Sequence, residues 1–271
     1  MLSVGAVQYL NTRPLVHGLA DAGVDVRYDL PSRLADRLAA ADLDVALIPS
    51  IETFRSGHRV VSDVCIGCRG PVMSVKLFFR TAPTRVATLA VDEGSRTSAA
   101  LARILLAERH GVMPATAVLP IGSGLADTRA DAVLLIGDRA LGSPDLAGGA
   151  FQLVWDLGDE WCRWTGLPFV FAVWAARRGV DASVIEPRLE AARDSGLANL
   201  AAIAAAEAGV HGLTVPQCLG YLRDNLHYEL GPGERESLAL FQRHAARLGL
   251  APPGRSPTTA VAFASSSGGA V

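Results

Sequence analysis

The strongest constraint on the fold is a pattern that occurs twice along the chain. A short apolar strand is followed by a polar corner, a helix, and a second apolar strand that begins at an aspartate and ends in a small polar loop. The first copy spans Ser3–Ser50 and the second spans Val86–Asp138. Strand runs such as SVGAVQY and VATLAV are continuously apolar, which is typical of strands buried on both faces of a parallel sheet. The repeat predicts two α/β lobes that face each other through the C-terminal edges of their strands, with a ligand cleft between them.

The first polar corner follows the strand Ser3–Tyr9 and contains Asn11 and Thr12. Proline fits the first turn of a helix, where its missing N–H costs nothing, so we expect a helix over Pro14–Ala22. Side chains at such a corner project from the edge of the sheet where open α/β sheets bind ligands, beside free backbone donors. The rest of the chain is therefore expected to supply the other walls of one pocket around Asn11.

Helical patterns account for most of the remaining chain. Ser32 is expected to cap a helix that carries an apolar stripe of leucines. After Arg177 the pattern is helical, and glycines divide it into three helices that should pack on a lobe. These helices are predicted over Glu186–Ala208, Val215–Leu230 and Gly233–Leu248.

Composition excludes several classes of partner. The chain has 271 residues, half of them hydrophobic, with a formal net charge of −2 and no basic run. Nothing therefore favours nucleic acid or an anionic membrane surface. No apolar run is long enough to span a bilayer, and no secretory signal pattern opens the sequence. We expect a cytoplasmic protein whose partner is a small molecule and which is a monomer or a homodimer.

The four cysteines include one CxxC motif, Cys65–Cys68, with no second pair or histidine nearby. A metal or redox role for this pair remains open. Reduced, partly buried thiols in a cytoplasmic protein are the favoured interpretation. No metal site is predicted.

Three further corners are expected to converge with the first. They are Ser50 with Glu52, the run Ser95–Ser98, and the run Gly137–Arg139. Ser95–Ser98 begins a strong helical pattern over Thr97–His110. Hydroxyls and free backbone N–H groups at a helix N-terminus form a carboxylate or phosphate site, although serine and threonine are also ordinary capping residues.

Individual residues at these corners allow two interpretations. Asn11 is either a neutral donor and acceptor for a ligand or a cap. Asp138 is either an acid or base, or an ion-pair partner of Arg139. Arg96 points either into the cleft or into solvent. The sequence contains no dinucleotide-binding, phosphate-loop, zinc-protease or serine-hydrolase motif. The residues alone thus predict a two-lobed α/β protein that holds a small anion with an unsaturated or apolar body, and no particular reaction.

At this point the sequence resembles the chorismate dehydratases of the futalosine route to menaquinone. The resemblance covers almost the whole chain except its C-terminal tail, in the order and spacing of that family. The matching stretches are VGAVQYLNTRPL, LDVALIPSIE, GPVMSV, SRTSAALARILL, LLIGDRAL, WTGLPFVFAVW and YLRDNLHYELG. The resemblance implies a fold like the type II periplasmic binding proteins. We expect lobe I to comprise residues 1–83 and 176–250, lobe II residues 84–175, and a flexible tail residues 251–271.

The resemblance also implies a reaction without metal or organic cofactor. Water would be removed from chorismate, a dicarboxylate, to give 3-[(1-carboxyvinyl)oxy]benzoate. We expect Asn11 to be catalytic. The expected substrate-binding residues are Ser50, Ser74, Ser95, Arg96, Thr97, Ser98, Gly137 and Asp138.

The proton-abstracting base is open. The corners offer Glu52 and Asp138, yet an ionised carboxylate would repel a dianionic substrate. Our hypothesis is that the enolpyruvyl carboxylate of the substrate takes the proton. Two alternatives to the dehydratase remain: the sister enzyme of the same pathway, which acts on cyclic dehypoxanthine futalosine, and a non-catalytic protein that binds a small anion.

Overall fold

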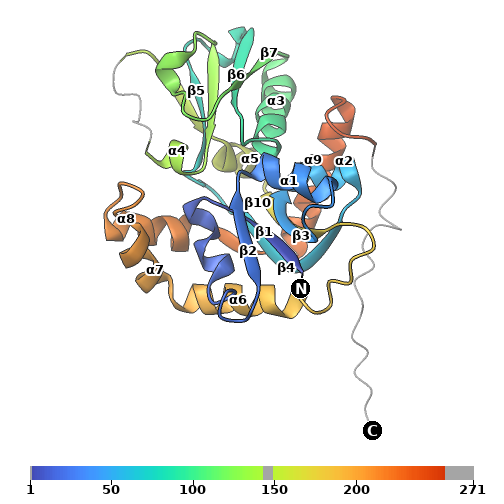
Figure 1. The fold of residues 1–271 in the computed structure, drawn as a ribbon. Helices are drawn as coiled ribbons and strands as arrows, with labels where there is room; N and C mark the ends of the chain where they lie inside the picture. The colour runs from blue at the N-terminus through green and yellow to red at the C-terminus, as the bar shows by residue number, and fades with distance from the viewer. Residues whose placement is uncertain (1, 143–148, 254–271) are drawn as a thin grey trace.

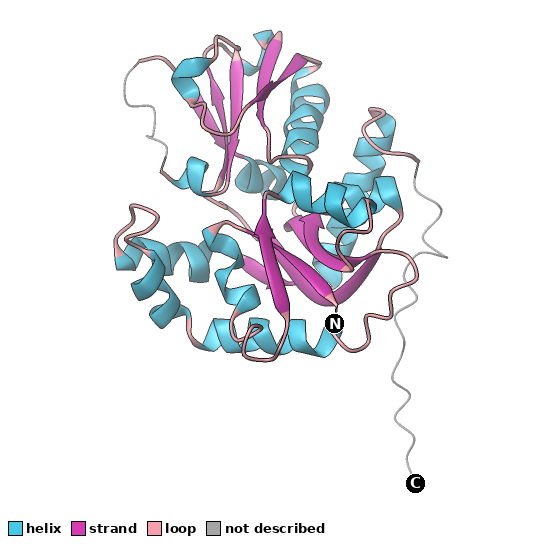
Figure 2. Cartoon of the chain, in the orientation of Figure 1, coloured by secondary structure: helices cyan, strands magenta, loops and turns pink. Residues whose placement is uncertain are grey.

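The computed structural model describes residues 2–142 and 149–253, which form two lobes, each built on its own mixed sheet (Figure 1). Among these residues, lobe I has a six-stranded sheet in the order β11-β4-β10-β3-β1-β2, and lobe II a five-stranded sheet in the order β7-β6-β8-β5-β9. Figure 2 shows the two sheets set apart, with helices packed around each. The expected two-lobed α/β architecture is confirmed.

The sheet of lobe I has a core that is buried on both faces. Its strands are β1 (Ser3–Val7), β2 (Asp25–Asp29), β3 (Val45–Pro49), β4 (Arg59–Cys68), β10 (Phe169–Ala176) and β11 (His227–Glu229). Every residue of β3 and β10 is buried, in keeping with their continuous apolar sequences. Strands β1, β2 and β3 run parallel, whereas β10 runs antiparallel to β3 and β4.

Helices pack on this sheet and also follow the C-terminal ends of β1 and β3. They are α1 (Pro31–Ala39), α2 (Ser50–Ser56), α6 (Glu186–Ala198), α7 (Leu200–Glu207), α8 (Val215–Gly220) and α9 (Pro232–Arg247), with a 3-10 helix η1 (Leu10–Val16) and a π-helix η4 (Tyr221–Asn225). Helix α1 packs on β1 and β3, α6 packs on η1 and β4, and α9 packs on β10.

Lobe II repeats the plan on a smaller scale. Its strands are β5 (Val75–Phe79), β6 (Thr88–Asp92), β7 (Ala115–Leu119), β8 (Ala132–Ile136) and β9 (Leu153–Asp156). Its helices are α3 (Thr97–His110) and the short α4 (Asp138–Leu141), with 3-10 turns η2 (Pro83–Arg85) and η3 (Leu125–Asp127). Helix α5 (Leu157–Thr165) connects β9 to β10 and lies where the two lobes meet (Figure 1).

The chain passes between the lobes at different points from those expected. Strand β5, expected in lobe I, pairs with β8 and β9 in the sheet of lobe II. Strand β10, expected in lobe II, pairs with β3 and β4 in the sheet of lobe I. The outward crossover therefore follows β4, and the return crossover runs through α5. An apolar run predicts a strand but not the sheet that it joins.

Several local expectations also change. The first corner does not precede a helix over Pro14–Ala22, because Asn11 and Thr12 already lie within η1. Leu30, not Ser32, is the N-cap of α1. The helix expected over Glu186–Ala208 breaks at Asn199 into α6 and α7. The helix expected over Val215–Leu230 becomes α8, η4 and the short strand β11.

The helix over Thr97–His110 is confirmed and ends at Gly111, whose φ of 68° is left-handed. Of the expected tail, residues 254–271 lie outside the described residues. None of the helices described has the length and apolarity to cross a membrane.

Candidate functional site

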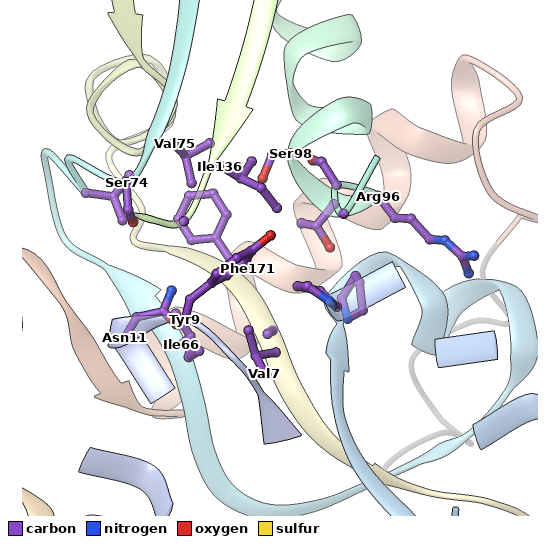
Figure 3. A pocket seen from close by; sticks show the side chains of 18 residues that line it. Val7, Tyr9, Asn11, Ile66, Ser74, Val75, Arg96, Ser98, Ile136 and Phe171 are labelled. Atoms are coloured by element: carbon purple, nitrogen blue, oxygen red, sulfur yellow. The ribbon is translucent and has the colours of Figure 1, made fainter. Parts of the chain in front are cut away.

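The two lobes border a cleft of about 500 Å³, a volume that includes space open to solvent (Figure 3). Lobe I and lobe II both contribute to its walls, together with the crossover that follows β4. Its apolar walls are Val7, Pro31, Pro49, Ile66, Val72, Val75, Ile136, Phe171 and Ala172, and its other lining residues are Tyr9, Asn11, Ser74, Gly94, Ser95, Arg96, Thr97, Ser98 and Gly137. Of the residues that the structure describes, no Asp or Glu lines this cleft.

The N-terminus of α3 faces the cleft and carries three hydroxyl residues. Arg96 is the N-cap and makes no side-chain capping hydrogen bond. The Ser95 hydroxyl is buried and has no hydrogen-bond partner among the described residues. Ser98, in the first turn, is buried beside the cleft (Figure 3). Because the first N–H groups of a helix lack internal partners and carry partial positive charge, this end of α3 is suited to a carboxylate.

Two residues at the start of α3 that are expected to bind substrate, Arg96 and Thr97, also contact lobe I. The Arg96 guanidinium lies 2.8 Å from the Asp36 carboxylate on α1 and 3.6 Å from Glu52 on α2, so it points away from the centre of the cleft. The Thr97 hydroxyl oxygen accepts the backbone N–H of Ile51 at 3.3 Å. Both side chains therefore anchor the α3 N-terminus against lobe I.

Ser50 is buried behind the cleft. Its hydroxyl donates to the Val170 carbonyl oxygen at 2.8 Å and lies 3.4 Å from the Thr97 hydroxyl oxygen. Ser50 does not line the cleft. It lies behind Thr97, which does.

Asn11 lies on η1 at the opposite wall, with its side chain directed toward the cleft (Figure 3). Its amide oxygen accepts the Thr12 hydroxyl at 3.3 Å. The fully buried Tyr221 hydroxyl lies beside Asn11 and Ser74, and these two side chains partly offset the rise that burial imposes on the pKa of Tyr221. That hydroxyl makes no well-aligned hydrogen bond among the described residues. Asn11 thus places a buried side-chain amide at the wall of the cleft.

Tyr9 is a lining residue that the sequence did not single out. It ends the loop after β1 and reaches across to lobe II: a Cβ on Gly94 would lie 2.9 Å from its hydroxyl, and a Cβ on Gly137 would lie 2.6 Å from its ring. The hydroxyl is buried without a partner among the described residues, and burial raises its pKa, so it stays protonated. In the sequence, Tyr9 could have been identified only as an aromatic residue with a hydroxyl at the C-terminal end of a strand, and such a residue is also typical of core packing.

The two candidate bases both point away from the cleft. Glu52 is paired with Arg55 at 2.8 Å and Arg96 at 3.6 Å. Asp138 accepts the backbone N–H of Leu10 at 3.0 Å and lies 3.3 Å from the His211 Nδ1 atom. Burial raises the pKa of Asp138. Asp138 belongs to lobe II and Leu10 is the first residue of η1, so this carboxylate caps the helix that carries Asn11.

The chain matches a known family over most of its length. A family model described as menaquinone biosynthesis matches residues 2–247. The chain belongs to the menaquinone biosynthesis family. One relative is the chorismate dehydratase of Thermus thermophilus. It is 34% identical to this chain over 259 residues, which cover 88% of this chain and 93% of that protein.

Solved structures similar to this family member are periplasmic-binding-protein-like in fold, as expected. A protein of Archaeoglobus fulgidus matches with a TM-score of 0.68 and 15% identity, over 92% of this chain and 98% of that one. The periplasmic aliphatic sulphonate-binding protein of Escherichia coli matches with a TM-score of 0.60 and 18% identity, over 92% and 86%. These likenesses concern the fold.

The expected site residues of this family member thus fall into two groups. Seven line the cleft: Asn11, Ser74, Ser95, Arg96, Thr97, Ser98 and Gly137. Ser50 and Asp138 lie behind it and support residues that do. No group of three or more His, Cys, Asp or Glu within residues 2–142 and 149–253 is arranged to hold a metal ion.

Proposed function

We propose that this chain is a chorismate dehydratase, a lyase that removes water from chorismate to give 3-[(1-carboxyvinyl)oxy]benzoate on the futalosine route to menaquinone. One observation carries the proposal. A chain 34% identical to a chorismate dehydratase closes a cleft that presents hydroxyls, an amide and a helix N-terminus but no described carboxylate. A dicarboxylate is accepted by such walls and would be repelled by acidic ones.

The proposed chemistry uses the α3 N-terminus as the site for charge. The hydrogen on the ring carbon that bears the enolpyruvyl ether is acidic through the conjugated ring carboxylate. Removing that hydrogen builds negative charge into the carboxylate, and loss of the neighbouring hydroxyl as water then makes the ring aromatic. The free N–H groups of α3, with the Ser95 and Ser98 hydroxyls, are placed to stabilise this charge as it develops.

The remaining walls orient the substrate. The ring would lie among apolar side chains such as Phe171 and Ile66. Asn11 faces α3 from lobe I and would hold the leaving hydroxyl or the second carboxylate, and Tyr9 supplies a protonated hydroxyl between them. Four free cysteines fit a cytoplasmic site of action.

We infer that the substrate's own enolpyruvyl carboxylate takes the proton. Glu52 and Asp138 are already engaged by Arg55 and by Leu10, and neither faces the cleft. Glu52→Gln is therefore expected to retain most of kcat, measured by the appearance of benzoate absorbance. Abolished turnover with intact chorismate binding would instead identify Glu52 as the base.

The function itself is tested by incubating chorismate with metal-stripped protein and following mass and ultraviolet spectra. A product lighter by one water, with a benzoate absorbance, is the expected result, and it should form far more slowly with Asn11→Ala protein. Unchanged chorismate together with a thermal shift would mean a binding protein. Turnover of cyclic dehypoxanthine futalosine in place of chorismate would mean the sister activity.

A further inference from the structure

The two crossover segments pack against each other beside α5. A Cβ on Gly158, in the first turn of α5, would lie 2.5 Å from the Cys68 sulfur and 2.8 Å from the Gly70 carbonyl oxygen. Contacts that short do not occur with a side chain at this position, so glycine is what lets the outward crossover lie directly on the helix. Cys68, the last residue of β4, is thus pressed against the return crossover.

The CxxC motif does not act as a pair in this fold. Residues three apart on a strand point to opposite faces of the sheet. Cys65 packs with Val170, Val173 and Leu230 on one face, whereas Cys68 belongs to the main core on the other. A second partner for Cys68 must come from elsewhere in the chain.

That partner is Cys162. It lies four residues after Gly158, on the same face of α5. Cys162 packs against the core cluster that contains Cys68, and the two thiols are close enough to shift each other's pKa. Cys68 is fully buried and Cys162 is half-buried, so one thiol of the pair is accessible to a small oxidant.

We propose that Cys68 and Cys162 form a reversible disulfide site that joins the two crossovers between the lobes, with hydrogen peroxide as the oxidant. The Cys162 thiolate attacks one oxygen of the peroxide, the O–O bond breaks, and hydroxide leaves, giving a sulfenic acid at Cys162. The Cys68 sulfur then attacks the sulfenic sulfur, the S–O bond breaks, and the Cys68 proton leaves with that oxygen as water. In sum, two thiols and one peroxide give one disulfide and two waters.

The environment of each thiol fits the role that the thiol has in this two-step oxidation. The neighbouring Cys68 thiol lowers the pKa of Cys162, which favours the thiolate needed for attack on peroxide. The same contact, together with burial, raises the pKa of Cys68. Cys68 therefore holds its proton until the sulfenic acid has formed beside it.

The test is oxidation of the full-length protein with hydrogen peroxide, followed by denaturation, alkylation of free thiols and peptide mapping. We expect a linked peptide pair containing Cys68 and Cys162, loss of two alkylatable thiols, and recovery of both with dithiothreitol. Cys65→Ser and Cys218→Ser proteins, which keep the pair, should behave in the same way. Cys162→Ser, at the half-buried position, should lose the link while all its other thiols remain alkylatable.

Three results would overturn the proposal. One is a linked peptide that contains Cys65 or Cys218. Another is oxidation of Cys162 to a sulfinic acid with Cys68 still free. The third is no loss of thiols at peroxide concentrations that oxidise an unfolded control of the same chain. None of these readouts depends on the reaction that the cleft performs.

Discussion

Substitution of Gly137 by alanine is expected to have two separable costs, one for the folding of lobe II and one for the closure of lobe II on lobe I. Gly137 has φ of 60° and ψ of −143°, a region that side chains avoid, and holding alanine there costs about 1–3 kcal/mol of unfolding free energy. The new Cβ would also lie 2.6–2.7 Å from three ring carbons of Tyr9, where ordinary carbon contacts are about 3.5–4.0 Å. Because Tyr9 belongs to lobe I, this second cost acts only when the lobes are closed.

Overpacking of this kind costs about 1–3 kcal/mol, which corresponds to roughly a 5- to 150-fold loss of kcat/KM at 1.36 kcal/mol per tenfold. The assay is chorismate turnover beside urea unfolding. Gly142→Ala is the matched control, because Gly142 has φ of −80° and its nearest neighbour would be 3.7 Å away. A Tyr9→Ala background should remove the kinetic cost and leave the unfolding cost. If Gly137→Ala lowers the unfolding free energy but keeps kcat/KM within about twofold, Tyr9 does not rest on Gly137 during turnover.

Substitutions at three other residues probe the site and its frame. Asn11→Ala should lower kcat by about 10²–10³ if the amide acts in the transition state; an effect on KM alone, with kcat unchanged, would argue against that role. Asp138→Asn keeps an acceptor for the Leu10 N–H and should retain most of kcat/KM, whereas Asp138→Ala should lose about fivefold, since a lost cap costs about 1 kcal/mol. Equal losses in steady-state assays would show that the charge matters instead. The Ser3 N–H donates to Asp44 at 2.9 Å and lowers the pKa of that carboxyl. The stabilisation that the ionised carboxyl gives to the fold is therefore present above the ordinary pKa of about 3.9, and it is lost as pH falls through the lowered pKa. Asp44→Asn should therefore lose about 1 kcal/mol or less in urea unfolding at pH 7, and the difference from the unsubstituted chain should shrink below about pH 4, whereas a difference that does not change with pH would contradict the linkage.

Local elements of the fold were predictable because their signals are local. The helix Thr97–His110 is bounded by hydroxyl residues at one end and Gly111 at the other, and it was placed to the residue. The strands of the repeated pattern were also found, since buried parallel strands are continuously apolar. Strand β11 was missed because three residues within a helical pattern carry no periodicity of their own.

Contacts between distant residues were not predictable from the chain alone. Asn11 and the α3 N-terminus were identified from their corners. That Asp138 turns away to cap η1 depends on packing between lobes, as does the position of Tyr9 against Gly137. The sheet that β5 or β10 joins likewise depends on pairing energies, which an apolar run of either strand does not encode.

The central position of β10 has a consequence for the order of folding. Strand β10 lies between β4 and β3 in lobe I, yet it follows all five strands of lobe II in the chain. Until β10 is added, the sheet of lobe I consists of two unconnected parts with open edges. During synthesis from the N-terminus, the complete sheet of lobe II is available before lobe I can close. The pairing of β4 with β10 spans the whole of lobe II, and loop closure over so long a span is slow unless the intervening chain is already compact. We therefore expect lobe II to fold first and to bring the two halves of lobe I together.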